Sequence, residues 1–176
     1  MRIAVITQPG FETELLAELA EIWPFLLQKN LQTNTEAWPE WDVRRGFIEG
    51  EVEIFQALQI NFFSRLASRV LLRALTKKVT SQAQVFQHLG QFPWQQTFEK
   101  DQKISLKIDL QSPLVNNEKW LKEKLFKESR FVFTKPYDAL ISLRGEWLQV
   151  SLNSSGEHLH KRGGLKARGL APLRET

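Results

Sequence analysis

The spacing of apolar and polar residues divides the start of the chain into short strands and one amphipathic helix. Residues 3–6 form a short apolar run before Pro9-Gly10, which predicts a strand and a turn. Over residues 11–23 apolar side chains recur at helical spacing with glutamates between them. This pattern predicts an amphipathic helix that ends near Pro24. Residues 46–50 are expected to form a strand bracketed by glycines.

A longer apolar stripe predicts one long helix over residues 52–73. The side chains recur at intervals that place them on one face of a helix; they are Ile54, Phe55, Leu58, Phe62, Leu66 and Val70. Residues 74–79 are expected to form the next strand, and the polar residues 28–42 a loop.

Shorter elements with clear periodicity follow in the second half of the chain. Residues 82–89 predict a short helix, and strict alternation over residues 104–110 predicts a half-buried strand. A lysine-rich helix is predicted over residues 116–127, and a hairpin over residues 139–143 and 147–152. The order is β-α-β-α-β followed by α-β-α-β-β. It predicts an α+β fold of two small layered units.

Length and composition are those of an ordinary globular protein. The 176 residues are 42% hydrophobic and 25% charged, enough for one or two domains with a real core. The absence of cysteine excludes disulfide frameworks, zinc fingers, iron–sulfur clusters and cysteine nucleophiles. No segment approaches the run of about 20 apolar residues that spans a bilayer, and the N-terminus is a poor signal peptide. We therefore expect a cytoplasmic protein without a membrane partner.

Charge is distributed unevenly along the chain. Residues 1–60 carry 4 basic and 10 acidic groups, a net of −6, whereas residues 61–176 carry 20 basic and 10 acidic groups, a net of +10. A basic second part suggests an anionic partner, with nucleic acid ahead of a membrane surface. A lysine-rich solvated surface without a partner is the alternative.

Three basic clusters are candidate nucleic-acid contacts. Arg65, Arg69 and Arg73 lie at i, i+4 and i+8 of the predicted long helix and would form one ridge suited to phosphates. Alternatively, acids inside the fold pair with them. The second cluster lies on the predicted lysine-rich helix and consists of Asn116, Asn117, Lys119 and Lys122, with Lys124 and Lys127. Here the alternative is a solvated helix face, because glutamates interrupt it; they are Glu118, Glu123 and Glu128.

The third cluster is a basic, glycine-punctuated tail over residues 158–169. Its cations are Lys161, Arg162, Lys166 and Arg168. Such a composition is typical of a flexible basic segment that becomes ordered when it binds RNA, or of a linker between domains. His158 and His160 form half of a metal site, but no matching cluster of ligands is visible in the sequence, so no metal is expected. Exposed members of the six tryptophans are candidates for base stacking, although most are expected in the core.

Motifs of complete enzymes are absent from the sequence. It contains no G-x-x-x-x-G-K-[ST] phosphate loop, no G-x-G-x-x-G after a strand and no G-x-S-x-G elbow. Two of the three histidines lie in the tail. The chain is therefore expected to be a binding module rather than a complete enzyme.

Several segments together resemble one protein family. They are Gly10-Phe11-Glu12, residues 46–50 (GFIEG), residues 61–71 (NFFSRLASRVL), Phe92-Pro93-Trp94, residues 155–163 (SGEHLHKRG) and residues 171–176 (APLRET). In these segments the chain resembles the N-terminal part of bacterial 23S ribosomal RNA guanine-N2 methyltransferases, where a THUMP RNA-binding domain precedes a class I S-adenosylmethionine domain. The resemblance covers essentially the whole chain, and the two end motifs are its most specific part.

This resemblance implies a domain plan. Residues 1–75 would form a ferredoxin-like unit, residues 76–154 a THUMP-type α/β unit, and residues 155–176 a basic linker towards a methyltransferase domain that this chain lacks. The family's glycine-rich methyl-donor loop and its Asn/Asp-Pro-Pro-aromatic motif are absent here. No catalytic residue is therefore carried over, and S-adenosylmethionine is expected only in a catalytic domain joined in cis or acting in trans.

The resemblance also implies the partner, with two departures from the family pattern. The implied partner is RNA, specifically 23S rRNA, and no DNA partner is expected. Gly164 and Leu165 stand where relatives have an aromatic and a basic residue, and Asn116-Asn117-Glu118 replaces an Asn-Ser-polar turn. The alternatives are a protein-interaction or scaffold domain without an RNA role, and a self-contained enzyme with a metal at His158 and His160.

Overall fold

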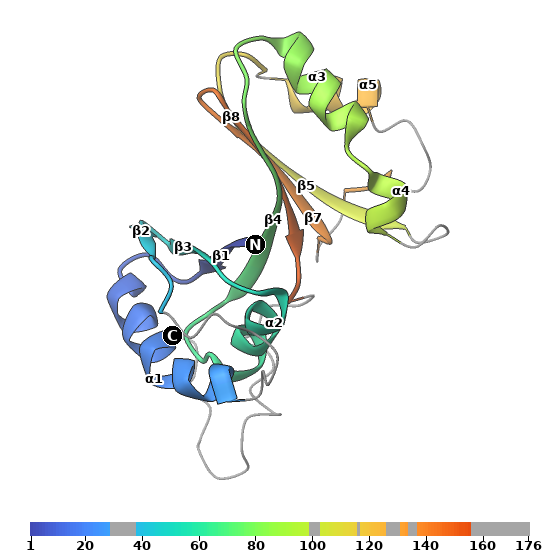
Figure 1. Ribbon diagram of the computed structural model, residues 1–176. Helices are drawn as coiled ribbons and strands as arrows, with labels where there is room; N and C mark the ends of the chain where they lie inside the picture. Colours follow the sequence, from blue (N-terminus) through green and yellow to red (C-terminus); the bar gives the residue numbers. More distant parts are fainter. Residues whose placement is uncertain (29–37, 99–102, 116, 126–130, 134–136, 156–176) are drawn as a thin grey trace. The chain divides into compact units, whose positions relative to one another are not determined.

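The computed structural model describes residues 1–28, 38–98, 103–115, 117–125, 131–133 and 137–155 (Figure 1). The chain divides into two compact units, with divisions at residues 72/73 and 153/154. We call residues 1–72 with residues 154–155 the N-terminal unit. Residues 73–153 are the C-terminal unit. The whole is a mixed arrangement of helices and strands, so the predicted α+β class is confirmed.

The N-terminal unit has the element order β-α-β-β-α-β. Its elements are β1 (Arg2–Ile6), α1 (Glu12–Gln28), β2 (Asp42–Arg44), β3 (Phe47–Glu51), α2 (Ile54–Phe63) and the first part of β4 (Arg69–Lys78). The strands are ordered β2-β3-β1-β4, and neighbouring strands are antiparallel. Each β-α-β crossover therefore has a third strand inserted between its two strands. Buried side chains of β1, α1 and α2 include Ile3, Val5, Leu15, Leu19 and Ile60.

One helix end and one strand in this unit differ from the sequence prediction. Helix α1 does not end near Pro24 but continues through it to Gln28. Trp23, directly before the proline, is 4% exposed and packs edge-on against Trp38 with ring centroids 5.4 Å apart. This packing offsets the backbone hydrogen bond that proline removes. The short strand β2 was not predicted at all, because three exposed residues carry no apolar pattern.

The predicted helix over residues 52–73 is wrong in its second half. Helix α2 ends at Phe63, and β4 takes up the chain from Arg69. The Glu18 carboxylate of α1 accepts hydrogen bonds from the Ser64 hydroxyl (2.5 Å) and from the backbone N–H groups of Arg65 (2.6 Å) and Leu66 (3.1 Å). These bonds turn the chain away from the helix. The residues that follow pair with β1, a contact that local spacing does not reveal.

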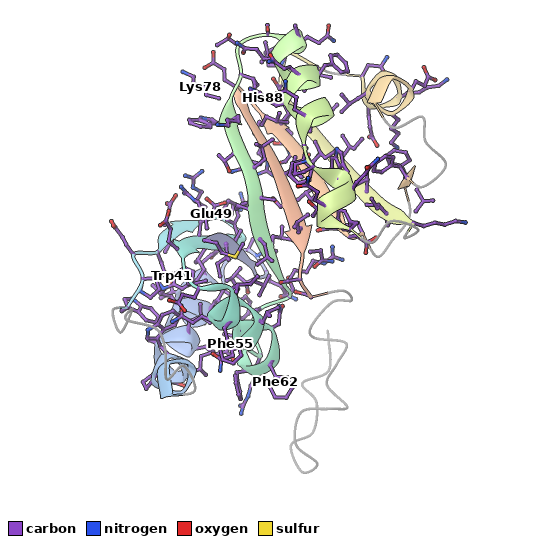
Figure 2. The ribbon with its side chains drawn as sticks, turned by 45° about the vertical axis from the view of Figure 1, so that its right-hand side comes forward. Trp41, Glu49, Phe55, Phe62, Lys78 and His88 are labelled. Carbon is purple, nitrogen blue, oxygen red and sulfur yellow. The ribbon has the colours of Figure 1, made fainter. Side chains whose placement is uncertain are left out.

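The part of the apolar stripe that lies on α2 faces solvent. Ile54, Leu58 and Phe62 are 58%, 47% and 77% exposed, whereas the opposite side of the helix is buried. Figure 2 shows Phe55 and Phe62 projecting from this helix. The rotation of the helix follows its polar bonds. Asn61 donates to the Ser154 hydroxyl (2.9 Å) and accepts from the Ser155 hydroxyl (2.6 Å), which requires Asn61 to point inward.

The C-terminal unit is a sheet with helices packed on one face. Besides the rest of β4 it contains α3 (Gln82–Gln91), α4 (Trp94–Thr97), β5 (Ile104–Gln111), α5 (Glu118–Leu125), β6 (Phe131–Val132), β7 (Ala139–Arg144) and β8 (Trp147–Asn153). The strands are ordered β4-β8-β7-β5-β6. Strands β7 and β8 form an antiparallel hairpin, and β5 runs parallel to β7. The predicted helix over 82–89, strand over 104–110 and hairpin are confirmed.

Alternating side chains of the C-terminal sheet point to its two faces. The inward residues form one apolar cluster with Val85 and Leu89 of α3, Trp94 of α4 and Leu121 of α5; the strand members are Ile104, Leu106, Ile108, Ala139, Ile141, Leu143, Leu148 and Val150. Figure 1 shows the three helices on one side of the strands. Among the described residues of this unit, no helix covers the opposite face.

Glu12, at the start of α1, ties two glycine turns together and makes stability depend on pH. Its carboxylate accepts hydrogen bonds from the N–H groups of Gly10 (2.9 Å) and Gly46 (2.5 Å), both in the left-handed region with φ of 98° and 85°. The bond from Gly46, followed by those from Gly10, lowers the pKa of Glu12. A lowered pKa stabilises the fold above the carboxyl's ordinary pKa of about 4.3, and the contribution disappears as the pH falls through the folded value.

Glu12→Gln should therefore lower the urea midpoint at pH 7, and the difference from the unchanged protein should shrink towards pH 3. Glu14→Gln, on the same helical turn but exposed, serves as the control and should leave the midpoint almost unchanged. A Glu12→Gln difference of equal size at pH 7 and pH 3 would contradict this assignment.

Candidate nucleic-acid interface

Lys119 and Lys122 of α5 lie at the surface of the C-terminal unit, the first exposed and the second partly exposed. Leu121 is fully buried in the core and fixes the rotation of the helix. The first turn is closed by a hydrogen bond from the Leu121 N–H to the Asn117 carbonyl (3.2 Å). Asn117 and Lys119 are exposed as a result. The predicted lysine-rich helix is confirmed, with bounds at Glu118–Leu125. Asn116 and the side chain of Lys124 lie outside the described residues.

Both described lysines of this helix have acidic neighbours. Lys119 is 86% exposed, and its Nζ lies 4.0 Å from Glu123. Lys122 is 31% exposed, and its Nζ lies 2.7 Å from Glu118 and 4.2 Å from the centroid of the Phe133 ring. Such surface pairs contribute about 0–1 kcal/mol, so a phosphate can replace the glutamate at little cost. The helix thus presents two cations that can exchange partners.

The three arginines do not form the predicted helical ridge, because the helix that was expected to carry them ends before Arg65. Arg65 is exposed in the connection between α2 and β4. Arg69 begins β4 and is only 6% exposed. Arg73, half-buried, donates from Nη1 to the Ser151 hydroxyl at 2.6 Å. Of the three, Arg65 has its side chain most open to an external anion.

The third basic cluster, with Lys161, Arg162, Lys166 and Arg168, lies outside the described residues, as do His158 and His160. Within the residues that the structure describes, no group of three or more histidines and carboxylates is placed to hold a metal ion. None of the described helices is long and apolar enough to cross a membrane.

The edge of the N-terminal unit near β2 and β3 is acidic. A hollow of about 750 Å³ there is lined by Glu40, Asp42, Glu49 and Glu51, with Arg2 as the one lining cation. Arg2 pairs with Glu49 at 3.1 Å. Figure 2 shows Glu49 and Trp41 in this region. Coulomb repulsion disfavours phosphates at this edge, so the charge asymmetry seen along the sequence persists on the folded N-terminal unit.

A second polar surface, missed by the sequence analysis, lies on the uncovered face of the C-terminal sheet. The inward residues of β5, β7 and β8 are apolar, so the alternate positions point to the other face. They include Lys107, Asp109, Arg144 and Trp147. Trp147 is 53% exposed, whereas Trp23 and Trp94 are buried. The alternation of the hairpin was the available signal, since Trp147 falls on the polar side.

Comparisons with known proteins place the chain near methyltransferases. It matches no family model. It is 26% identical over 132 residues to a Synechocystis protein named as an RNA methyltransferase, covering 67% of this chain and 34% of that protein. It is 28% identical over 144 residues to ribosomal RNA large subunit methyltransferase K/L of Psychromonas ingrahamii, covering 74% of this chain and 19% of that protein.

The fold itself is found in solved methylase structures. A Listeria monocytogenes structure described as an N6-adenine-specific DNA methylase superposes with a TM-score of 0.62 at 19% identity, covering 98% of this chain and 45% of that one. At this identity the likeness concerns the fold alone. The chain spans about a third of the length of one curated relative and about a fifth of the other, so it corresponds to only a part of such proteins.

Proposed function

We propose that this chain is the RNA-binding module of an RNA methyltransferase and brings the enzyme to its ribosomal substrate. The observation that carries the proposal is the similarity to two proteins named as RNA methyltransferases, one of them acting on large-subunit ribosomal RNA. Because the chain corresponds to about a third of one relative and about a fifth of the other, the proposal assigns the methyl-transfer chemistry and its S-adenosylmethionine to a separate domain, in cis or in trans.

The topology supports the expected domain types. The N-terminal unit has the β-α-β-β-α-β order with antiparallel strands in the order β2-β3-β1-β4, which suits a ferredoxin-like unit. The C-terminal unit, with three helices on one face of a mixed sheet, is the THUMP-type unit of the proposal. Within this proposal the acidic edge of the N-terminal unit takes no part in RNA binding, because it repels phosphates.

The contacts to RNA are assigned to cations at the surface, exposed or partly exposed. Lys119 and Lys122 of α5 would neutralise phosphates after releasing their glutamates, and Asn117 at the start of the helix would reach sugar or base edges. Arg65 adds one exposed cation. The cations of residues 158–169 would extend the contact along the RNA. We assign no direct RNA contact to Arg69, because its side chain is buried.

Salt dependence provides the test. Each phosphate neutralised by a lysine or arginine releases a counterion, so the affinity of the whole chain for a large-subunit rRNA fragment should fall steeply between about 50 and 200 mM salt. Charge reversal by the double change Lys161→Glu and Arg162→Glu should weaken binding and flatten the salt slope. Charge reversal at Glu40 and Asp42 to lysine is the matched control, because the proposal places no RNA at that edge.

Two results would contradict the proposal. No binding of the unchanged chain at 50 mM salt would overturn the RNA role and favour a protein-interaction domain. In that case the acidic edge and the exposed apolar residues of α2 become the surfaces to examine. An unchanged salt slope in the variant of Lys161 and Arg162 would remove these two residues from the interface.

A further inference from the structure

The uncovered face of the C-terminal sheet aligns unlike polar groups in rows across three strands. The register pairs Gln111 of β5 with Arg144 of β7, and Arg144 with Trp147 of β8. Partners directly opposite in neighbouring strands point to the same face with their Cβ atoms about 5 Å apart. One row therefore contains an amide, a guanidinium and an indole side by side.

The Arg144 guanidinium of this row is oriented by the Asp109 carboxylate. Arg144 Nη2 lies 2.9 Å from Asp109 Oδ2, and Gln111 Nε2 donates to Asp109 Oδ1 at 3.2 Å. Asp109 belongs to the next row and lies on β5 together with Gln111. Its carboxylate therefore binds both the Gln111 amide and the Arg144 guanidinium. The Arg144 side chain is nevertheless 56% exposed. It is thus oriented and still open to a ligand.

A second row of side chains lies next to this one on the same face of the sheet. The next row contains Ser142 and Gln149, opposite each other in β7 and β8, with Ser142 Oγ 3.5 Å from Gln149 Oε1. Ser142 is small and 5% exposed, whereas Gln149 lies two residues from Trp147 on the same strand and the same face. The indole of Trp147 is itself 53% exposed and therefore accessible to a flat ligand.

These groups match the chemistry of an unpaired nucleotide. Bases that are not paired stack on aromatic side chains and on guanidinium planes, and amides reach the hydrogen-bonding edges of the base. We propose that this row binds one unpaired RNA nucleotide, with its base stacked on Trp147 and Arg144 beside it. The proposal rests on the proposed function and adds to it a site for single-stranded RNA separate from the lysines of α5.

A protein partner fits this face less well. The centre of a protein interface is depleted in charged residues, whereas this face presents Lys107, Arg144 and Asp109 around a single aromatic side chain. The apolar residues exposed on α2, by contrast, lie in a continuous stripe and belong to the other unit. The composition of the row therefore favours a ligand with both a π-face and charge.

The experiment measures binding of the whole chain to a fluorescent ten-nucleotide uridine-rich RNA, single-stranded or annealed to its complement. Trp147→Ala should lower the affinity for the single strand about 5- to 100-fold, the usual effect of replacing an aromatic side chain that stacks on one base. Trp147→Phe should retain most of the affinity. Phe62→Ala is the matched control, because this aromatic side chain is 77% exposed but lies on α2, and it should change nothing.

The salt dependence separates stacking from charge. Trp147→Ala should leave the salt slope unchanged, whereas Arg144→Ala should weaken binding and reduce the slope by about one if the guanidinium also contacts phosphate. Equal affinity of Trp147→Ala and the unchanged protein for the single strand would overturn this site and leave the proposed function standing. No binding of the unchanged protein to the single strand, with binding to the large-subunit rRNA fragment retained, would also overturn this site alone, whereas no binding to either RNA would overturn both proposals. A loss confined to the duplex would also contradict the proposal, since stacking needs an unpaired base.

Discussion

Trp94→Ala is expected to lower the free energy of unfolding of the C-terminal unit by about 3–5 kcal/mol, the usual cost of removing a large buried aromatic side chain. Trp94 is 9% exposed and lies 4.5 Å from Phe92 and 5.7 Å from Phe131, measured between ring centroids. Its indole Nε1 donates to the Leu89 carbonyl at 3.0 Å. The substitution therefore opens a cavity and leaves a buried carbonyl without its donor.

Chemical denaturation with hydrogen exchange at the amides of β5 and β7 measures this loss within the C-terminal unit. Trp94→Phe keeps the aromatic contacts but removes the indole N–H, and should cost a smaller part of the total. Trp147→Ala is the matched control, because this tryptophan is 53% exposed, and should change stability by about 0.5 kcal/mol or less. Losses of similar size for Trp94→Ala and Trp147→Ala would show that the Trp94 cluster is not part of a packed core.

Asn61→Leu is expected to cost about 2–4 kcal/mol of stability in the N-terminal unit. The Asn61 amide donates to the Ser154 hydroxyl (2.9 Å) and accepts from the Ser155 hydroxyl (2.6 Å). The Ser155 hydroxyl in turn accepts from the Val70 N–H of β4 at 2.7 Å. Leucine at this position would remove the Asn61 amide from both of these hydrogen bonds, and the loss of a hydrogen-bond partner by a buried polar group costs about 1–3 kcal/mol.

A double-mutant cycle isolates this network from simple packing effects. Asn61→Ala and Ser155→Ala remove the two ends of one hydrogen bond, so their combined cost should differ from the sum of the single costs by about 0.5–3 kcal/mol. Urea denaturation of the two single variants and of the double variant gives the coupling. If the costs of the two single variants simply add up in the double variant, the shared network is refuted and Asn61 contributes only by packing.

The elements that the sequence predicts correctly are those in which spacing and environment agree. In β5, Leu106 and Ile108 alternate with Lys107, and the sheet has one covered and one uncovered face, so the period of two appears directly. In α3, Val85 and Leu89 lie one helical turn apart and both reach the core. Local pattern and tertiary packing give the same answer in such segments.

Helix α2 and strand β4 show the opposite case. Residues 52–73 carry a helical apolar pattern, yet the chain turns at Ser64 because Glu18, distant in sequence, accepts its hydroxyl and two following N–H groups. The helix is then rotated so that Asn61 points inward and Phe62 outward. Both outcomes depend on contacts more than 40 residues apart, and no local window contains them.

The candidate interface divides in the same way. Lysines on a predicted amphipathic helix were identifiable from the sequence, because charge and helical spacing are local properties, and Lys119 and Lys122 lie on the surface as expected. The grouping of Gln111, Arg144 and Trp147 was not, because it requires the parallel register of β5 against β7. Nor could the burial of Arg69 be foreseen, since it follows from the place of that residue in β4.

Composition, periodicity and charge thus already establish an α+β protein with a basic second part and no cysteine chemistry, since these properties are sums or repeats over neighbouring residues. The end of α2, the rotation of its apolar stripe and the row on the uncovered sheet face come from the folded chain alone. Each depends on which distant strands and carboxylates meet, and the free energy of those contacts exceeds the local preferences of the residues involved.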